Sequence, residues 1–323
     1  MRSSIPGALT QPKCRFLRLF VYNKKLISIF RFLSFCTAPV LIAVIVFKIS
    51  WHHEKEAAFA KKFEAISPED RFDLEAFFRL LILKEGGGYV LFGNKPVAFT
   101  AFSPHNNDSM GLRQIIRYDQ DNKIISKGWQ TWEKYAPLFR SRQFILECRK
   151  FHDNRFEICL IKKDRFKQIV KTNLPHFQSI LGDKITPDIL LSSYCKNDQP
   201  LFHLLKRHHA LLGILLGFGT ENSWLFHENT RLNSEDPNAT GRNLLKAIQP
   251  YPTHLCNHTL QGLFNERNHR KCFKFLYLPY FFADPNSEES QILKEQYIQQ
   301  QRTIHNAYAH GHFLEVTLRK FCQ

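Results

Sequence analysis

The sequence predicts an α+β protein, with an N-terminal transmembrane helix followed by a soluble domain whose antiparallel sheet of about five strands is covered by helices. Three observations lead to this prediction. A charge-free apolar run lies near the N-terminus, two later stretches have the pattern of paired strands, and apolar residues elsewhere recur at helical spacing. With 323 residues, 44% of them hydrophobic, the chain can bury a substantial core.

The net charge of +16 is distributed unevenly along the chain. Residues 1–50 contain eight of the 45 Lys and Arg residues and none of the 29 Asp and Glu residues, so they supply half of the excess. A short basic leader of this kind is typical of a membrane topology signal. We therefore predict that residues 1–31 form a cytoplasmic leader, and we expect no nucleic-acid partner.

Residues 32–47, FLSFCTAPVLIAVIVF, carry no charge. Extended to an interfacial Trp51, the segment 32–51 reaches the roughly 17–25 residues that a membrane helix needs. We predict an uncleaved single-pass signal anchor in the lipid bilayer, with the N-terminus in the cytoplasm and residues 52–323 across the membrane. The alternatives are a buried helix of a soluble protein and a cleaved secretory signal. The nearest cleavage pattern, Ala58-Phe59-Ala60, lies too far beyond the apolar run for the latter.

The soluble domain is expected over residues 65–323, and its first helix has a clear start. Ser67 suits the N-cap, Pro68 suits the first helical position, and Asp70 follows at the third position. The apolar residues that follow are spaced for one helix face, and glycines 86–88 predict the end of the helix.

The stretch EGGGYVLFGNKPVAFTAF, residues 85–102, resembles a phosphate-binding loop at first sight. Such a loop needs Gly-Lys-Ser/Thr leading into a helix. Here Asn94 separates Gly93 from Lys95, and Pro96 and a strand pattern follow. The stretch therefore predicts a β-hairpin, with strands at 89–92 and 97–102, and we expect no cofactor.

A second hairpin is predicted by QFILECRKF and FEICLIKK, which flank an Asx-type turn. If Asp153-Asn154 is a two-residue turn, Phe151 lies opposite Phe156 and Cys148 lies opposite Cys159. The cross-strand pair Cys148–Cys159 is then the disulfide candidate, and two reduced neighbours are the alternative.

Apolar periodicity and turn residues predict the remaining elements. A fifth strand is expected at 271–278. The predicted helices are 111–137, 163–181 with a break or kink at Pro175, 186–195, 199–217, 220–230, 287–308 and 311–321.

Three blocks, YVLFGNKPVAF, HHALLGILLGFGTENSWLF and LPYFFADPNSEESQILKEQY, make the chain resemble a set of uncharacterised single-span membrane proteins of obligate intracellular bacteria. The similarity covers most of residues 65–310. It implies a basic leader and one apolar segment before a soluble domain of about this length. It implies no activity and no catalytic residue.

One neighbourhood carries the candidates for catalysis. His208 or His209, together with Glu221, can form an acid–base pair, and the glycines between them allow close approach of a ligand or a second helix. The alternative is a capped helix–turn–helix in the core, with its basic residues facing solvent.

The strongest metal candidates are Cys256, His258, His269 and Cys272, because two Cys and two His can satisfy tetrahedral zinc. Their spacing fits no common zinc finger, and the alternative is a polar loop before a strand.

The sequence is best interpreted as a membrane-anchored, non-catalytic domain that binds a protein or envelope component, with residues 199–230 as the surface. An envelope-facing hydrolase or transferase and a secreted host-directed effector are the alternatives. Whether the chain is an enzyme is left open by these residues.

Overall fold

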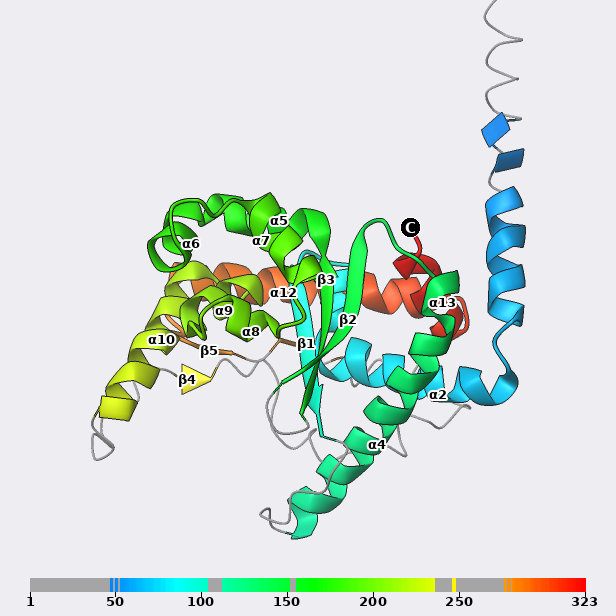
Figure 1. Cartoon of the computed structure of the whole chain (residues 1–323), viewed down its shortest axis with the longest axis horizontal. Coiled ribbons are helices and arrows are strands. Elements are labelled where there is room, and N and C mark those ends of the chain that lie inside the picture. The colour runs from blue at the N-terminus through cyan, green and yellow to red at the C-terminus, as the bar shows by residue number, and fades with distance from the viewer. Residues whose placement is uncertain are drawn as a thin grey trace, which may run out of the picture. The chain divides into compact units, whose positions relative to one another are not determined.

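The computed structural model covers the whole chain and describes residues 47–103 except Ile49 and His52, together with 112–151, 155–235, 246–247, 276, 278–279 and 281–323. The chain divides into two compact units, residues 1–61 and 62–323. The second unit is mostly helical and contains a three-stranded antiparallel sheet (Figure 1), so the predicted α+β class is confirmed. Within the described residues, this sheet is smaller than the five strands predicted.

In the first unit, the described residues between Phe47 and Lys61 are helical. Trp51 stacks on Phe47 with ring centroids 6.2 Å apart, and the ammonium of Lys55 lies 5.0 Å from the centre of the Trp51 ring. No helix among the described residues has both the length and the apolarity needed to cross a membrane. The predicted span, 32–51, lies mostly outside the described residues and stays a prediction.

Helix α2 (Pro68–Arg79) begins where the sequence predicts. The side chain of Ser67 accepts a hydrogen bond from the backbone N–H of Asp70 (3.1 Å), which satisfies one of the free donors at the helix start. A π-helical turn, η1 (Leu80–Lys84), continues the helix. Gly86 follows at φ +77°, a left-handed conformation that favours glycine and ends the segment.

The residues after Gly86 form a helix, so the first predicted hairpin is wrong. Gly87–Leu91 is the short helix α3, and the backbone N–H of Phe92 donates to the carbonyl oxygen of Gly88 (3.0 Å). Only the second arm of that hairpin, β1 (Val97–Phe102), is a strand. All five residues of α3 are buried, and a short apolar run buried on every side has no periodicity that separates helix from strand.

The sheet has the strand order β1-β3-β2, with antiparallel neighbours throughout. β2 (Phe144–Lys150) and β3 (Phe156–Lys162) confirm the second hairpin, but the predicted register is wrong by one residue, since Cys148 lies opposite Ile158. The N–H of Phe151 donates to the carbonyl oxygen of Arg155 (2.7 Å), so three residues and not two separate the last pair. A shift of one residue moves each predicted partner to the other face.

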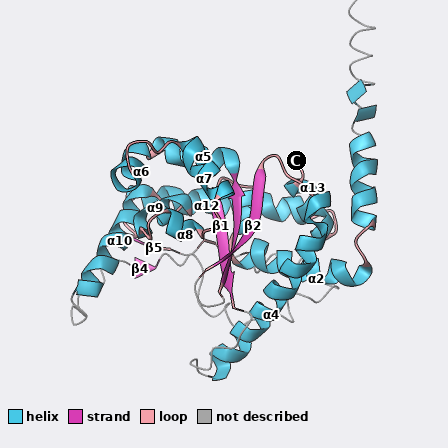
Figure 2. Ribbon diagram, viewed as in Figure 1, coloured by secondary structure: helices cyan, strands magenta, loops and turns pink. Residues whose placement is uncertain are grey.

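Helices cover both faces of the sheet (Figure 2). The odd-numbered residues of β2 and β3 face a core built with α5 (Lys163–Thr172), α7 (Pro187–Lys196) and α9 (His209–Leu215). The even-numbered residues face α4 (Leu112–Tyr135) and α13 (Phe313–Phe321), where Phe144 stacks on Phe321 at 5.9 Å. The short helices η2 (Ala136–Leu138) and α6 (Leu174–Leu181) complete this part of the unit.

The helix predicted over 199–217 is broken in two. α8 (Leu201–Leu204) and α9 are separated by Lys206 and Arg207, both at positive φ (52° and 59°). Two consecutive left-handed residues cannot continue an α-helix. The predicted break near Pro175 is confirmed, because α5 ends at Thr172 and Pro175 lies in the first turn of α6.

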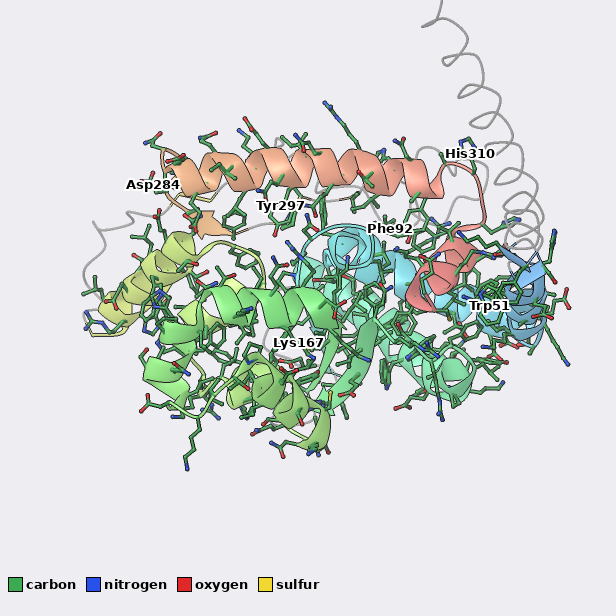
Figure 3. The ribbon with its side chains drawn as sticks, turned by 90° about the horizontal axis from the view of Figure 1, so that it is seen from above. Trp51, Phe92, Lys167, Asp284, Tyr297 and His310 are labelled. Carbon is green, nitrogen blue, oxygen red and sulfur yellow. The ribbon has the colours of Figure 1, made fainter. Side chains whose placement is uncertain are left out.

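The C-terminal helices confirm their predictions. Ser287 caps α12 (Glu288–Tyr308), and Figure 3 shows Tyr297 pointing from α12 into the unit, where its hydroxyl donates to the carbonyl oxygen of Gly217 (2.7 Å). In the first turn of α12, the carboxylate of Glu289 accepts hydrogen bonds from the N–H groups of Thr220 (2.6 Å) and Asn222 (2.9 Å). It thereby caps α10 (Thr220–Glu235) and suits the dipole of that helix.

A small two-stranded ladder joins β4 (Lys246–Ala247) to β5 (Phe282–Ala283). The strand predicted at 271–278 lies largely outside the described residues. Leu276 and Leu278, the two that are described, are buried and are not in a strand.

The contact between α2 and α4 gives a stability prediction at Gly128. An added methyl group there would overlap Cβ of Phe77 and lie 3.1 Å from the carbonyl oxygen of Asp73. Replacing Gly by Ala in an exposed helix stabilises by about 1 kcal/mol. We expect Gly128→Ala to lower the free energy of unfolding by about 1–3 kcal/mol, because overpacking pushes the two helices apart.

Denaturant unfolding of the full-length protein measures this change. The matched control is Gln130→Ala, on the exposed side of the same helix, which we expect to alter the free energy of unfolding by less than about 0.5 kcal/mol. A stabilised G128A protein would contradict the close packing of α2 on α4.

Candidate functional site

The predicted catalytic neighbourhood brings His208 and His209 together with residues of α10. The rings of His208 and His227 stack with centroids 4.0 Å apart, and the Trp224 ring lies 5.3 Å from that of His208. His209 lies 6.4 Å from His227 by the same measure. The structure therefore assembles an aromatic cluster of imidazole and indole rings between α9 and α10.

Glu221 is not joined to this cluster by any contact in the described part of the chain. Its side chain is exposed at the start of α10, and its backbone N–H lies 3.3 Å from the carboxylate of Glu289. The acid near His208 is Glu228 instead. The three predicted residues thus do not form one acid–base arrangement.

The histidine cluster is buried at its nitrogen atoms. Nδ1 of His208, Nδ1 of His227 and Nε1 of Trp224 have no hydrogen-bond partner among the described residues. Burial, followed by the neighbouring His227 and His209, lowers the pKa of His208 to about 4. His208 is therefore neutral at physiological pH, which suits ring packing better than proton transfer.

The zinc candidates Cys256, His258, His269 and Cys272 all lie outside the described residues. Within the residues that are described, no three His, Cys, Asp or Glu side chains form a group that could hold a metal ion. The predicted zinc site therefore stays a prediction.

The disulfide candidates Cys148 and Cys159 lie on opposite faces of the sheet. Cys148 lies opposite Ile158, and Cys159 lies opposite Glu147. Because successive side chains of a strand point to opposite faces, the two thiols are on different sides of the sheet. Both are free in the structure. The predicted pairing depended on the register that the structure corrects by one residue.

Lys95, in the stretch that resembled a phosphate loop, is buried. Its side chain is 5% exposed, and its ammonium lies 5.4 Å from the centre of the Phe218 ring. Burial lowers the pKa of Lys95 to about 8, and the nearby Glu85 partly offsets this effect. A strand, β1, follows Lys95, so this lysine does not lead into a helix as the lysine of a phosphate loop does.

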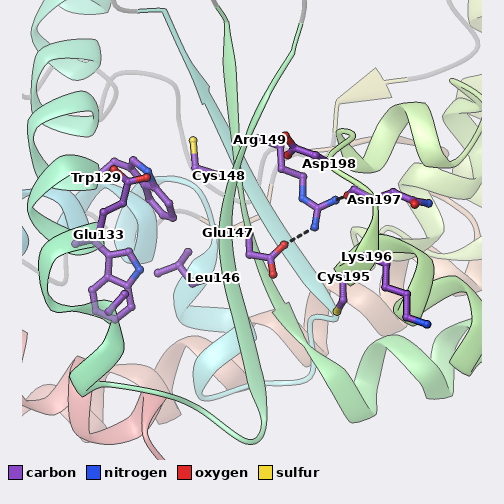
Figure 4. Close-up of a pocket in the computed structure, with 12 residues that line it drawn as sticks. Trp129, Glu133, Leu146, Glu147, Cys148, Arg149, Cys195, Lys196, Asn197 and Asp198 are labelled. Carbon is purple, nitrogen blue, oxygen red and sulfur yellow. Dashed lines mark hydrogen bonds and ion pairs between the residues drawn. The ribbon is translucent and has the colours of Figure 1, made fainter.

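The clearest binding geometry is a cleft of about 370 Å³ along β2. Its floor consists of the four consecutive residues 146–149, and it lies between two walls (Figure 4). One wall is α4, with Trp129, Trp132 and Glu133. The other is the end of α7 and the residues that follow it, 195–198.

Among the described residues, β2 pairs only with β3, so the floor of the cleft is an open edge of the sheet in this part of the chain. At the two ends of the β2–β3 ladder, the N–H of Lys163 donates to the carbonyl oxygen of Gln143 (2.9 Å) and the N–H of Phe151 donates to that of Arg155 (2.7 Å). Hydrogen-bonded pairs alternate along an antiparallel ladder, so the odd-numbered residues of β2 point their backbone groups toward β3. The even-numbered residues therefore point their N–H and C=O groups away from β3. One of these groups, the backbone N–H of Phe144, donates a hydrogen bond to the Ser141 hydroxyl (2.9 Å).

Leu146 and Cys148 thus present backbone N–H and C=O groups to the cleft. No hydrogen bond to these groups occurs within the described segments. Unpaired groups on an edge strand are a template on which a further strand can form. An open edge between two walls therefore has the geometry that an added extended backbone requires.

Arg149 holds the second wall in place. Its guanidinium donates to the carbonyl oxygens of Asn197 and Gln199 (3.0 Å to the latter) and forms an ion pair with Glu147. It also lies 3.8 Å from the centre of the Tyr194 ring, a cation–π contact. The side chain is only 5% exposed, so these contacts replace its hydration.

Glu157, opposite Arg149 on β3, completes this buried polar group. Its carboxylate accepts hydrogen bonds from the N–H of Leu201 (2.8 Å) and the thiol of Cys159 (3.3 Å). Burial raises the pKa of Glu157, while the Leu201 N–H, Cys159 and Arg149 act in the opposite direction. The network ties the sheet to the start of α8.

Comparison with known proteins finds no matching family model, no matching curated protein and no matching solved structure.

Sequence reasoning missed the cleft, since it is formed by segments that are distant along the chain. One signal was present: QFILECRKF places Glu147 and Arg149 on the same side of a strand as Ile145. Charged residues at inward positions indicate a buried ion pair or a functional edge.

The buried carboxylate gives a pH prediction. Glu157→Gln removes a buried charge and retains an oxygen that can accept the Leu201 N–H. Because the pKa of Glu157 is raised in the folded state, the wild-type protein loses stability as pH rises from 4.5 through the folded pKa. We expect E157Q to raise the free energy of unfolding at pH 7 by about 1 kcal/mol or more, and to have no such effect below pH 4.5.

Urea unfolding between pH 4 and pH 8 measures this difference. Glu133→Gln, an exposed acid on α4, is the control and is expected to show little pH-dependent change. Destabilisation by E157Q that is equal at every pH would contradict the argument, because the loss would then come from hydrogen bonding and not from charge.

Proposed function

We propose that residues 62–323 form a peptide-binding domain, which takes up an extended segment of a partner protein as an additional strand beside β2. The observation that carries the proposal is the open backbone edge of Leu146 and Cys148 at the floor of a walled cleft. In strand addition, main-chain hydrogen bonds supply affinity and side-chain pockets supply specificity. The volume of about 370 Å³ lies in the range of ordinary ligand clefts.

The walls favour a single strand over a second copy of the domain. α4 on one side and residues 195–198 on the other flank the edge of β2 (Figure 4). If the β2 edges of two copies approached each other, the α4 and the 195–198 segment of one copy would collide with those of the other. A peptide without walls of its own meets no such obstacle, so the occupant we infer is an extended segment of a different protein.

The same proposal places the domain at a membrane, through an anchor at residues 32–51. The sixteen-residue charge-free run and the basic leader before it support this part. In this arrangement the peptide-binding unit lies across the membrane from residues 1–31. The partner would then be an extracytoplasmic protein or an envelope component.

Removal of one backbone donor at the cleft floor tests strand addition. Cys148→Pro deletes an N–H that points away from β3, so the β2–β3 ladder is retained, as for Pro on other edge strands. We expect C148P to weaken peptide binding by about 5- to 150-fold, because a carbonyl of the peptide is left unpaired. The probe is an array of mixed-sequence ten-residue peptides, with full-length protein in a non-ionic detergent.

Cys148→Val is the matched control, since it also removes the thiol but keeps the N–H. Equal binding by wild-type and C148V proteins, with loss in C148P, supports strand addition. Equal loss in C148P and C148V would assign the effect to the side chain. Binding to no peptide, or a concentration-dependent dimer that C148P abolishes, would overturn the proposal.

The anchor is tested by carbonate extraction and by reporter fusions at residues 25, 60 and 323. We expect membrane association that resists carbonate, with the fusions at 60 and 323 exported and the fusion at 25 retained in the cytoplasm. A product released by carbonate, or cleaved after residue 47, would refute the anchor. The outcome is independent of peptide binding.

A further inference from the structure

The charge of the cleft identifies the kind of peptide that it takes, an inference that rests on the proposed peptide-binding function. Acidic groups lie on both walls: Glu133 is exposed on α4, and Asp198 is exposed after α7. Figure 4 shows Cys148 of β2 between them. Neither carboxylate forms an ion pair within the described residues, so both are available to an incoming charge.

The basic residues of the cleft do not neutralise these two acids. Arg149 is paired with Glu147 and contacts Tyr194 and the carbonyl of Gln199. Lys196 is exposed, and Figure 4 shows its side chain directed away from β2. The acidic character around Cys148 is also seen in its thiol, whose pKa is raised to about 12 by burial and then by Glu133, Glu157 and Asp198.

The register of an added strand determines which side chain meets this charge. A peptide residue directly opposite Cys148 would project its side chain on the same face as Cys148, the face covered by α4. Trp129, Trp132 and Glu133 line that wall. A carboxylate beside aromatic rings favours a cation, and most of all a guanidinium, which pairs with carboxylates and packs on aromatic rings.

We propose that the cleft selects extended peptides with Arg or Lys at the position opposite Cys148, held by Glu133 on the α4 wall, in a cleft to whose negative charge Asp198 contributes from the other wall. Acidic side chains at that position are disfavoured by repulsion. The selected ligand is thus a basic extended segment of a partner protein.

A positional-scanning peptide library tests this selectivity. Each ten-residue peptide has Arg, Lys, Gln or Glu at one fixed position in a mixed background, and binding to full-length protein is measured by fluorescence anisotropy. At one position we expect Arg and Lys peptides to bind about fivefold more tightly than Gln peptides, with Glu peptides weaker still. The preference should shrink as salt increases, which a purely steric pocket would not show.

Charge reversal supplies the decisive comparison. Glu133→Lys should remove the preference for Arg and favour Glu peptides, while Glu133→Gln should reduce the preference without reversing it. Asp198→Lys, on the other wall, should weaken the preference for Arg, because it lowers the negative charge of the cleft without removing Glu133. Both sites are exposed, so these variants are expected to fold normally.

The outcomes separate this inference from the proposed function. Peptides that bind wild-type protein and fail to bind C148P, but show no preference among Arg, Gln and Glu, would overturn the charge selection and leave strand addition intact. An Arg preference that persists undiminished in E133K and D198K proteins would also overturn it. Binding to no peptide at all would overturn both.

Discussion

A single buried guanidinium, that of Arg149, links the sheet to the end of α7 and the residues after it. Arg149 projects from the sheet into the space between β2 and the end of α7, where it contacts the Tyr194 ring and donates to carbonyl groups that no helix uses. The residues after α7 have no regular structure of their own at this point. The donors of this one side chain bind two of their carbonyl oxygens and so fasten the second wall to β2.

Arginine suits this place for physical reasons. A guanidinium offers five donors in a fixed plane and is weakly hydrated, so it can be buried at lower cost than an ammonium and can serve several acceptors together. Here those acceptors are backbone carbonyls, a carboxylate and a ring face. A lysine could reach one or two of them but not bridge β2 to the α7 end in the same way.

Local chemistry explains which parts of the fold the sequence predicted. The start of α2 was predicted from Ser67, because capping depends on residues within one turn. The helix α3 and the break at Lys206-Arg207 were not predicted, since both are imposed by packing and not by local preference. The one-residue error in register came from the length of a turn, which the flanking pairs did not fix.

The candidate site was harder to predict than the fold. The neighbourhood chosen from sequence, His208, His209 and Glu221, is close along the chain but only partly close in space. The cleft combines residues from 129 to 198, which lie on α4, η2, β2 and α7 and on the segment after α7. No spacing in the sequence expresses such an arrangement, because it follows from the order of strands and from which edge stays open.

The alternation along β2 has a consequence for how this protein can change over time. At Leu146 and Cys148 the backbone N–H and C=O groups face the cleft, while the side chains face α4. Each of these positions therefore has a backbone hydrogen-bonding capacity that does not depend on the identity of its side chain. In the strand addition proposed above, substitution of the side chain, or of a wall residue on α4, would alter which sequences are accepted and leave the backbone groups of the floor unchanged. A surface that binds in this way could change its choice of partners over time and still bind a peptide at every step.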